Sequence, residues 1–103
     1  MTLSTHVLDL ATGRPVPDLP VRVEDVSGPV ALAVTDADGR AKDLVPTEQW
    51  GPGLWRLIFD VAGHLGPDAF FPEVVLAFRA SDDGHLHVPL LLSPFGYSTY
   101  RGS

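Results

Sequence analysis

The sequence lacks cysteine, has little positive charge and contains no long apolar run. Without cysteine, disulfides, thiolate nucleophiles and cysteine-based metal sites are excluded. Seven Lys and Arg stand against 13 Asp and Glu, giving a formal net charge of −6. Nucleic acids and anionic membranes are bound by basic surfaces, which this balance disfavours. Apolar stretches such as Val74–Phe78 are far too short to span a bilayer.

The beginning of the sequence also lacks the basic and apolar segments that make up a signal peptide. We therefore expect a cytoplasmic protein that binds neither nucleic acid nor membrane. A length of 103 residues with 45% hydrophobic residues predicts one domain with its own core, residues 1–103. Because a domain of this size buries its surface only moderately well, assembly into an oligomer would help to stabilise it.

Ten glycines and ten prolines interrupt the chain every few residues and exclude long helices. Between them lie short segments, several of which alternate apolar and polar residues, the period of a half-buried strand. The expected strands are Thr5–Ala11, Val21–Val26, Val30–Thr35, Leu54–Val61, Val74–Ala80, His85–Leu92 and Tyr97–Arg101. Such a series of short strands predicts an all-β sandwich or barrel of seven to eight strands. Residues 62–69 can hold at most one short helix, because they contain Gly63, Gly66 and Pro67.

Four histidines are candidates for chemistry near neutral pH: His6, His64, His85 and His87. His85 and His87 are two residues apart in an expected strand, so both point to the same face. Such a pair can ligate zinc, or it can be the exposed end of a strand. Pro89 follows in the same segment, and since proline cannot donate to a sheet, it indicates an edge, a bulge or the end of pairing.

Two further segments carry polar groups of less specific meaning. Arg40 follows Asp38 and Gly39, which predict a tight turn or bulge, and most arginines in such places are simply solvated. The segment 93–103 contains two tyrosines, an arginine and several hydroxyls. If it is ordered it needs a surface to pack against; otherwise it is an ordinary last edge strand.

Five segments together resemble one family, the 5-hydroxyisourate hydrolases, which are related to the transthyretins. They are Ser4–Asp9 with Gly13–Pro15, Thr35–Arg40, Phe70–Val74, His85–Pro94, and the terminal Tyr100–Ser103. The resemblance extends from Leu3 to Ser103. Hormone-carrying transthyretins share the Leu-Leu-Ser-Pro and Tyr-Ser-Thr segments but lack the catalytic histidines and the terminal Tyr-Arg-Gly-Ser.

The resemblance implies a transthyretin-like two-sheet β-sandwich with at most one short helix. It also implies a homotetramer in which two dimers pack together, with the sites at the dimer–dimer interface. Such an assembly suits a small domain with unpaired strand edges. One departure is visible, because the segment 62–69 is shorter than the helix-containing connection of the family.

The implied reaction is hydrolysis of 5-hydroxyisourate to 2-oxo-4-hydroxy-4-carboxy-5-ureidoimidazoline in urate degradation, without metal or cofactor. The family's catalytic residues fall on His6, Arg40, His87 and Ser103, and its substrate-binding residues on His6, Arg40, Tyr100, Arg101 and Gly102. A histidine would take the proton of the attacking water, and the planar fork of Arg40 would bind paired carbonyl oxygens. Which histidine is the base stays open. His85 has a supporting role at most, and His64 has none.

Three other interpretations are compatible with parts of the sequence. A transthyretin-like carrier would hold a small ligand without turnover. A plain structural or interaction module would carry its polar residues incidentally. A zinc hydrolase would use His85 and His87 with a third ligand from elsewhere.

Overall fold

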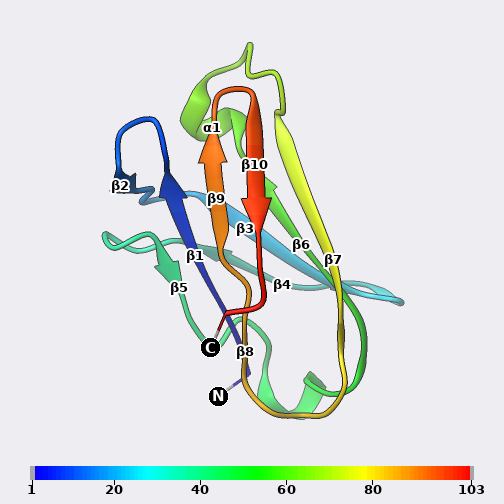
Figure 1. Cartoon of the computed structure of the whole chain (residues 1–103). Coiled ribbons are helices and arrows are strands. Elements are labelled where there is room, and N and C mark those ends of the chain that lie inside the picture. Colours follow the sequence, from blue (N-terminus) through cyan, green and yellow to red (C-terminus); the bar gives the residue numbers. More distant parts are fainter. Residues whose placement is uncertain (1, 103) are drawn as a thin grey trace.

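The computed structural model describes residues 2–102 as two packed β-sheets (Figure 1). In one sheet the order is β10-β9-β1-β2, with β5 and β8 also paired to β1. In the other sheet the order is β4-β3-β6-β7. The strands of the first sheet are β1 (Leu3–Asp9), β2 (Arg14–Pro15), β5 (Arg40–Ala41), β8 (Leu86–His87), β9 (Leu90–Ser93) and β10 (Gly96–Thr99). Those of the second are β3 (Pro20–Asp25), β4 (Gly28–Val34), β6 (Gly53–Asp60) and β7 (Glu73–Ala80).

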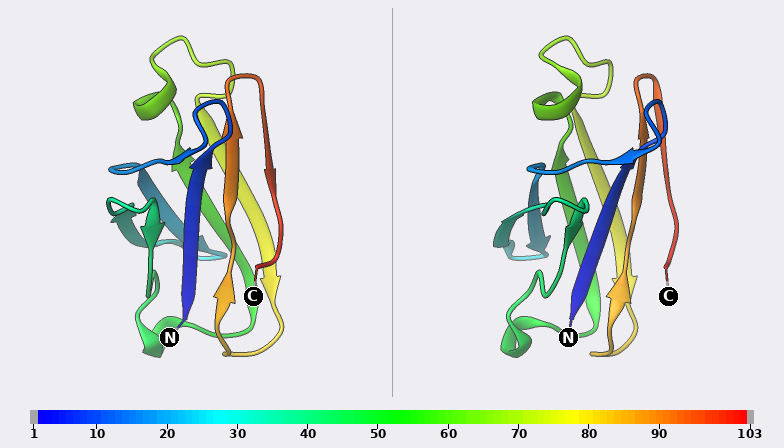
Figure 2. Two further views of the ribbon diagram at one scale, coloured as in Figure 1. Left: turned by 60° about the vertical axis from the view of Figure 1, so that its left-hand side comes forward. Right: turned by 90° about the vertical axis from the view of Figure 1, so that its left-hand side faces the viewer.

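The hydrophobic core fills the space between the two sheets. Strand β3 buries Val21 and Val23 completely and leaves Arg22 exposed, as its alternating sequence predicts. From the other sheet, Val7 and Leu90 face the same core and are fully buried. In the right-hand view of Figure 2, β1 (blue) crosses in front of β6 and β7 (green and yellow), and β9 and β10 (orange and red) lie to one side. The predicted two-sheet sandwich is therefore confirmed.

Within residues 2–102, seven strands have four or more residues, and they correspond to the seven expected segments. Three further strands, β2, β5 and β8, have two residues each and all pair with β1. Two residues are too few to show an alternating pattern, so the sequence did not indicate β2 and β5. The expected short helix is α1 (Ala62–Leu65), and a 3-10 turn, η1 (Thr47–Gln49), was not expected. No helix among the described residues is long and apolar enough to cross a membrane.

The segment expected as one strand over 85–92 is divided at Pro89 into β8 and β9. Both halves run parallel to β1 in the same register, with Leu86 opposite Leu3 and Leu90 opposite Val7. The interruption is therefore a loss of regular pairing at Pro89 and not a bulge, because proline has no N–H to donate. Since the register continues, β8 and its histidines stay aligned with the beginning of β1.

Candidate active site

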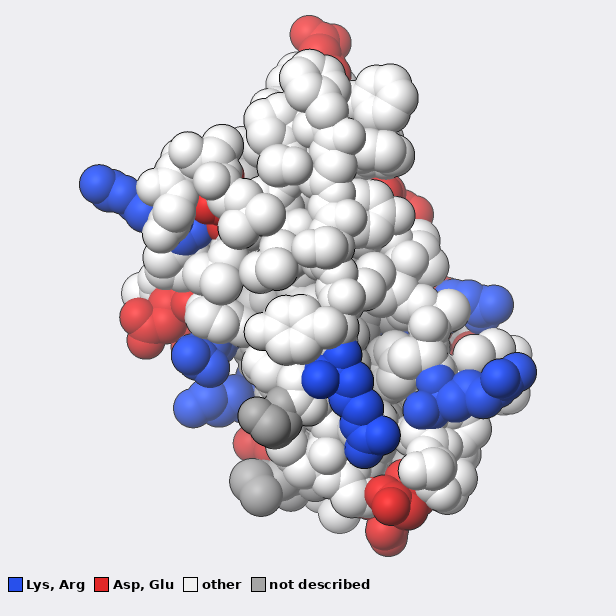
Figure 3. Space-filling view, in the orientation of Figure 1, with Lys and Arg blue, Asp and Glu red and all other residues white. Residues whose placement is uncertain are grey.

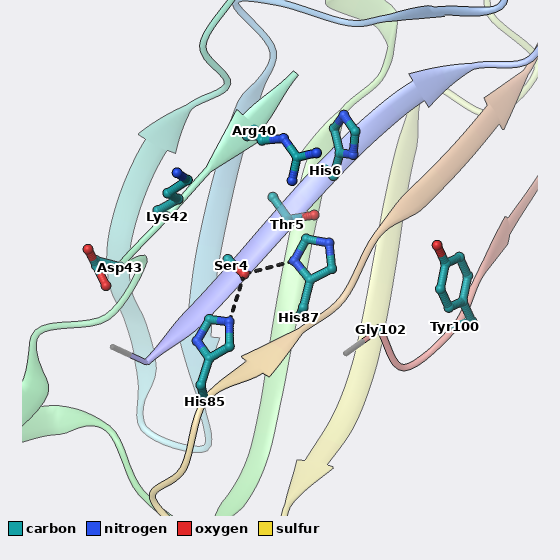
Figure 4. Close-up of a pocket in the computed structure, with 10 residues that line it drawn as sticks. All are labelled: Ser4, Thr5, His6, Arg40, Lys42, Asp43, His85, His87, Tyr100 and Gly102. Carbon is teal, nitrogen blue, oxygen red and sulfur yellow. Dashed lines mark hydrogen bonds between the residues drawn. The ribbon is translucent and has the colours of Figure 1, made fainter. Parts of the chain in front are cut away.

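Strand β1 brings the candidate residues together through its two neighbours. In the antiparallel pair β1–β5, His6 lies opposite Arg40, and in the parallel pair β1–β8, Ser4 lies opposite His87. Residues opposite each other in a sheet point to the same face, as do residues two apart in one strand. His6, Arg40 and His87 therefore share the outer face of this sheet, although they come from three distant segments (Figure 4).

These side chains line a pocket of about 570 Å³. The pocket lies at the end of the sheet where β8 and β5 flank β1. Its lining consists mainly of polar residues: Ser4, Thr5, His6, Arg40, Lys42, Asp43, His85, His87, Tyr100 and Gly102. Five of the residues expected at the site are thus in one place: His6, Arg40, His87, Tyr100 and Gly102.

Arg40 is positioned by the tight turn that precedes it. The carboxylate of Asp36 accepts hydrogen bonds from the backbone N–H groups of Asp38 and Arg40, at 2.8 and 3.0 Å. These bonds keep the pKa of Asp36 below its ordinary value, the bond from Arg40 contributing most. Gly39 has a φ of 74°, and a Cβ there would lie 2.6 Å from the carbonyl oxygen of Val7. Only glycine lets this turn lie so close to β1.

The same turn holds His6. The distance between its Nε2 and the carbonyl oxygen of Asp38 is 2.9 Å. Because a carbonyl oxygen can only accept, Nε2 of His6 carries the hydrogen of this bond. The neutral form of His6 therefore keeps Nδ1 as its unprotonated nitrogen.

His87 is the more enclosed of the two expected catalytic histidines. Its Nδ1 is 2.8 Å from the hydroxyl of Ser4, and the same hydroxyl is 3.3 Å from Nε2 of His85. Burial lowers the pKa of His87 below its ordinary value of 6.5, and the positive charge of Arg40 lowers it further. His87 is consequently neutral at physiological pH, as a general base must be.

The chain following β10 closes one side of the pocket. Gly102 donates a backbone hydrogen bond of 2.7 Å to the carbonyl of His87, and a Cβ on Gly102 would lie 2.6 Å from Cδ2 of the His87 ring. Tyr100 is 57% exposed and lines the pocket. Arg101 lines a neighbouring apolar groove along β7 instead, and Ser103 lies outside the described residues. The proposed roles of Arg101 and Ser103 in binding and catalysis stay predictions.

Several residues of the pocket were not anticipated, namely Ser4, Thr5, Lys42 and Asp43. The strand period contained the signal for two of them, since Ser4 precedes His6 by two residues and Lys42 follows Arg40 by two. Asp43 is the one acidic residue among the described residues that line the pocket. Among the described lining residues, the two positive charges of Arg40 and Lys42 stand against the single negative charge of Asp43.

His64 lies apart from the pocket. Its Nε2 is 2.8 Å from a carboxylate oxygen of Asp9, at the end of β1. The pKa of the buried Asp9 is lowered below its ordinary value, and the hydrogen bond from His64 is the largest cause. Burial acts in the opposite direction, and the hydrogen bonds from the backbone N–H groups of Ala11 and Thr12 lower the pKa further. The interaction ties α1 to β1. Among residues 2–102 no three His, Asp or Glu side chains are grouped so as to hold a metal ion.

The fold and the pocket together define a class of protein, a small β-sandwich with histidines and an arginine gathered on the outer face of one sheet. The model of the HIUase/Transthyretin family matches residues 3–102, and the chain belongs to this family.

Comparison with individual proteins gives relatives of two kinds. The chain is 45% identical over 109 residues to 5-hydroxyisourate hydrolase of Salmonella dublin, covering 98% of this chain and 80% of the relative. The solved structure of Klebsiella pneumoniae 5-hydroxyisourate hydrolase has a TM-score of 0.86 and 32% identity, with all of both chains covered. Sea bream transthyretin in complex with thyroxine has a TM-score of 0.89 and 29% identity, covering 99% of this chain and 95% of the other. The fold alone is thus shared by enzymes and a hormone-binding protein, and the pocket must decide between them.

Proposed function

We propose that this protein hydrolyses 5-hydroxyisourate to 2-oxo-4-hydroxy-4-carboxy-5-ureidoimidazoline in urate degradation. One observation carries this conclusion: the pairing of β1 with β5 and β8 gathers His6, Arg40 and His87 on one face of one pocket. A carrier for an apolar ligand has no use for this set. A hydrolase needs a base for water, a cation for developing negative charge and donors that hold a planar ring.

His87 acts as the general base in this proposal. Its Nδ1 is engaged by Ser4, so Nε2 is the ring nitrogen available to a water molecule. As Nε2 takes a proton, the water oxygen forms a bond to the ring carbonyl carbon of the substrate. The C–N bond of the ring amide then breaks, and the proton passes from His87 to the departing nitrogen. The balance is one water consumed and one ring opened, with His87 returned to its neutral state.

Arg40 stabilises the negative charge that develops on the carbonyl oxygen during this attack. Its planar donors suit the paired oxygens of the substrate, and the turn at Gly39 holds its backbone against β1. His6 lies opposite Arg40 and orients the substrate or the water through its Nδ1. Tyr100, Arg101 and Gly102 complete the proposed substrate contacts, and Ser103 is retained as the proposed catalytic hydroxyl.

We further propose that four copies assemble with the pocket between two dimers. The outer face of the β1-β9-β10 sheet supports this arrangement, because its central and upper parts are almost free of charged side chains in Figure 3. Leu10, Phe95 and Tyr100 are exposed to 58%, 81% and 57%. A second dimer would cover such an apolar surface and enclose the pocket. Residues 1–103 would form one hydrolase domain, and we place the protein in the cytoplasm.

The decisive experiment generates 5-hydroxyisourate with urate oxidase and follows its ultraviolet absorbance with and without this protein. We expect the wild type to accelerate the decay, with or without a chelator, and His87→Ala to reduce kcat/KM by about 10²-fold. Decay at the spontaneous rate would contradict the proposed function. Loss of activity with chelator would instead indicate a zinc enzyme that uses His85 and His87.

The carrier function keeps one supporting observation, the similarity to sea bream transthyretin in complex with thyroxine. It predicts tight retention of a small apolar ligand and no turnover in the same assay. Equilibrium binding of thyroxine to the wild type, measured beside the hydrolysis, separates the two functions.

A further inference from the structure

The Ser4 hydroxyl lies between two imidazole rings, an arrangement that the proposed reaction does not by itself require. Ser4 is 7% exposed, and its Oγ is 2.8 Å from Nδ1 of His87 and 3.3 Å from Nε2 of His85. Figure 4 shows both rings turned toward this hydroxyl from the strand segment beside β1. His85 was expected to be no more than a supporting residue, and Ser4 was not expected at the site at all.

The hydroxyl has a single hydrogen, and this limits how the three groups can be connected. If Ser4 donates to His87, then Nδ1 of His87 is unprotonated, and in the neutral ring Nε2 carries the hydrogen. If Ser4 donates to His85 instead, Nδ1 of His87 donates to Ser4, and Nε2 of His87 is left unprotonated. Only the second arrangement leaves an unprotonated nitrogen, Nε2, that is not bonded to Ser4 and can therefore act as the base.

We propose that Ser4 and His85 are positioning residues, which hold His87 in the tautomer with hydrogen on Nδ1 and a free electron pair on Nε2. This proposal rests on the proposed role of His87 as base. In this arrangement Nδ1–H of His87 donates a hydrogen bond to Oγ of Ser4, and Oγ–H of Ser4 donates one to Nε2 of His85. His85 contributes by accepting the one hydrogen of Ser4, so that this hydrogen is not directed at His87.

The opposite side of the His87 ring is confined as well. Gly102 lies so close that a Cβ would be 2.6 Å from Cδ2 and 3.3 Å from Cγ of His87. The backbone of Gly102 is in turn bonded to the carbonyl of His87 at 2.7 Å. The ring is therefore held by hydrogen bonding at Nδ1 and by packing at Cδ2, and no other residue within 2–102 forms a hydrogen bond with Nε2.

Nitrogen NMR of the wild-type protein tests the tautomer directly. With ¹⁵N-labelled histidine, long-range ¹H–¹⁵N correlations distinguish protonated from unprotonated ring nitrogens, and His87→Gln assigns the His87 signals. At about pH 8, where a free imidazole is neutral, we expect Nδ1 of His87 to be protonated and Nε2 to be unprotonated. A spectrum with hydrogen on Nε2 would overturn the proposal. Because this measurement needs no turnover, its outcome is independent of whether the proposed reaction is correct.

Substitutions test the consequence for the reaction. Ser4→Ala removes the hydroxyl; we expect His87 to lose its fixed tautomer and kcat to fall roughly 10–100-fold with little change in KM, the scale for partners that orient functional imidazoles. Full kcat with an unchanged His87 tautomer in Ser4→Ala would refute the proposal. Ser93→Ala is the matched control, because it removes a hydroxyl with one 2.8 Å hydrogen bond from the same sheet outside the pocket.

His85 is tested by a pair of variants. His85→Gln keeps an acceptor near the position of Nε2 and is expected to preserve the His87 tautomer and most of kcat. His85→Leu removes the acceptor and is expected to lower kcat, though less than Ser4→Ala, since the bond to His85 is the longer one. If the two variants had the same kcat and the same His87 tautomer, His85 would have no part in the hydrogen-bonded series with Ser4 and His87.

Discussion

At the scale of single residues, a substitution at Arg40 can show whether the pocket needs only a positive charge there or also the planar pair of donors. Lysine keeps the positive charge but loses the planar pair of donors. We expect Arg40→Lys to lower kcat/KM roughly 10–100-fold, the equivalent of one charge-assisted hydrogen bond. The control is Arg22→Lys, which changes an exposed arginine on β3 paired with Glu24 and leaves the reaction untouched. If Arg40→Lys kept full activity, charge alone would be sufficient at this position.

The pKa of His87 leads to a prediction about pH. Burial favours the neutral ring, and Arg40 repels the added proton, so His87 titrates below 6.5. Turnover that depends on neutral His87 is therefore expected to persist as the pH falls through 6.5 and to be lost only below it. An NMR titration of His87 checks the direction, and Arg40→Gln should raise this pKa by removing a positive charge. A wild-type pKa above 6.5 would contradict the structure.

Gly102 provides a prediction that depends on steric contact. The methyl group of Gly102→Ala would overlap Cδ2 of His87, so either the ring or the chain end must move. We expect kcat/KM to fall about 10–100-fold while the fold persists, because small displacements of a catalytic group have effects of this size. Gly96→Ala is the matched control, since its Cβ meets only Ser93 Oγ at 3.7 Å. Equal activity of the two variants would show that the contact at Gly102 has no consequence.

At the scale of elements, the bond between His64 and Asp9 holds α1 against the end of β1. We expect His64→Ala to reduce the free energy of unfolding by about 1–2 kcal/mol, because a buried carboxylate loses a hydrogen-bonded partner, while kcat/KM is unchanged. Chemical denaturation and the hydrolysis assay measure the two effects. A loss of turnover at full stability would mean that His64 belongs to the active site.

The same pair determines how stability responds to acid. The folded-state pKa of Asp9 is lower than its ordinary value of 3.8. Ionisation of Asp9 therefore stabilises the fold, and this contribution is complete at pH values above 3.8. This contribution is lost as the pH falls below 3.8 toward the folded-state pKa. Asp9→Asn serves as the comparison, since it should be less stable at neutral pH and show a smaller further loss in acid.

At the scale of the whole molecule, the exposed apolar residues of the outer sheet face predict association. We expect the protein to elute as a tetramer and its apparent melting temperature to rise with protein concentration. Sedimentation over a dilution series, with turnover measured on the same samples, tests whether activity follows the tetramer. A fully active monomer would contradict a site enclosed by a second dimer.

The sequence by itself predicted the seven longer strands and the alternating faces of their residues, because side chains in a strand alternate with a period of two. It did not indicate the two-residue strands β2 and β5. It also predicted the tight turn before Arg40, through Asp38 and Gly39, but it left Pro89 open between an edge, a bulge and the end of pairing. The five family segments then identified His6, Arg40, His87, Tyr100 and Gly102, which the structure places around one pocket.

Only the tertiary structure decided which strands are neighbours and in what register. Ser4 and His87 are 83 positions apart, and no local pattern predicts that the parallel pairing of β1 with β8 sets their polar atoms 2.8 Å apart. The approach of Gly102 to His87 and the bond of His64 to Asp9 likewise join segments that lie far apart along the chain or in different elements. The physical reason is that a strand's period specifies its face, whereas register is specified by packing and hydrogen bonding between strands once the whole sandwich has formed.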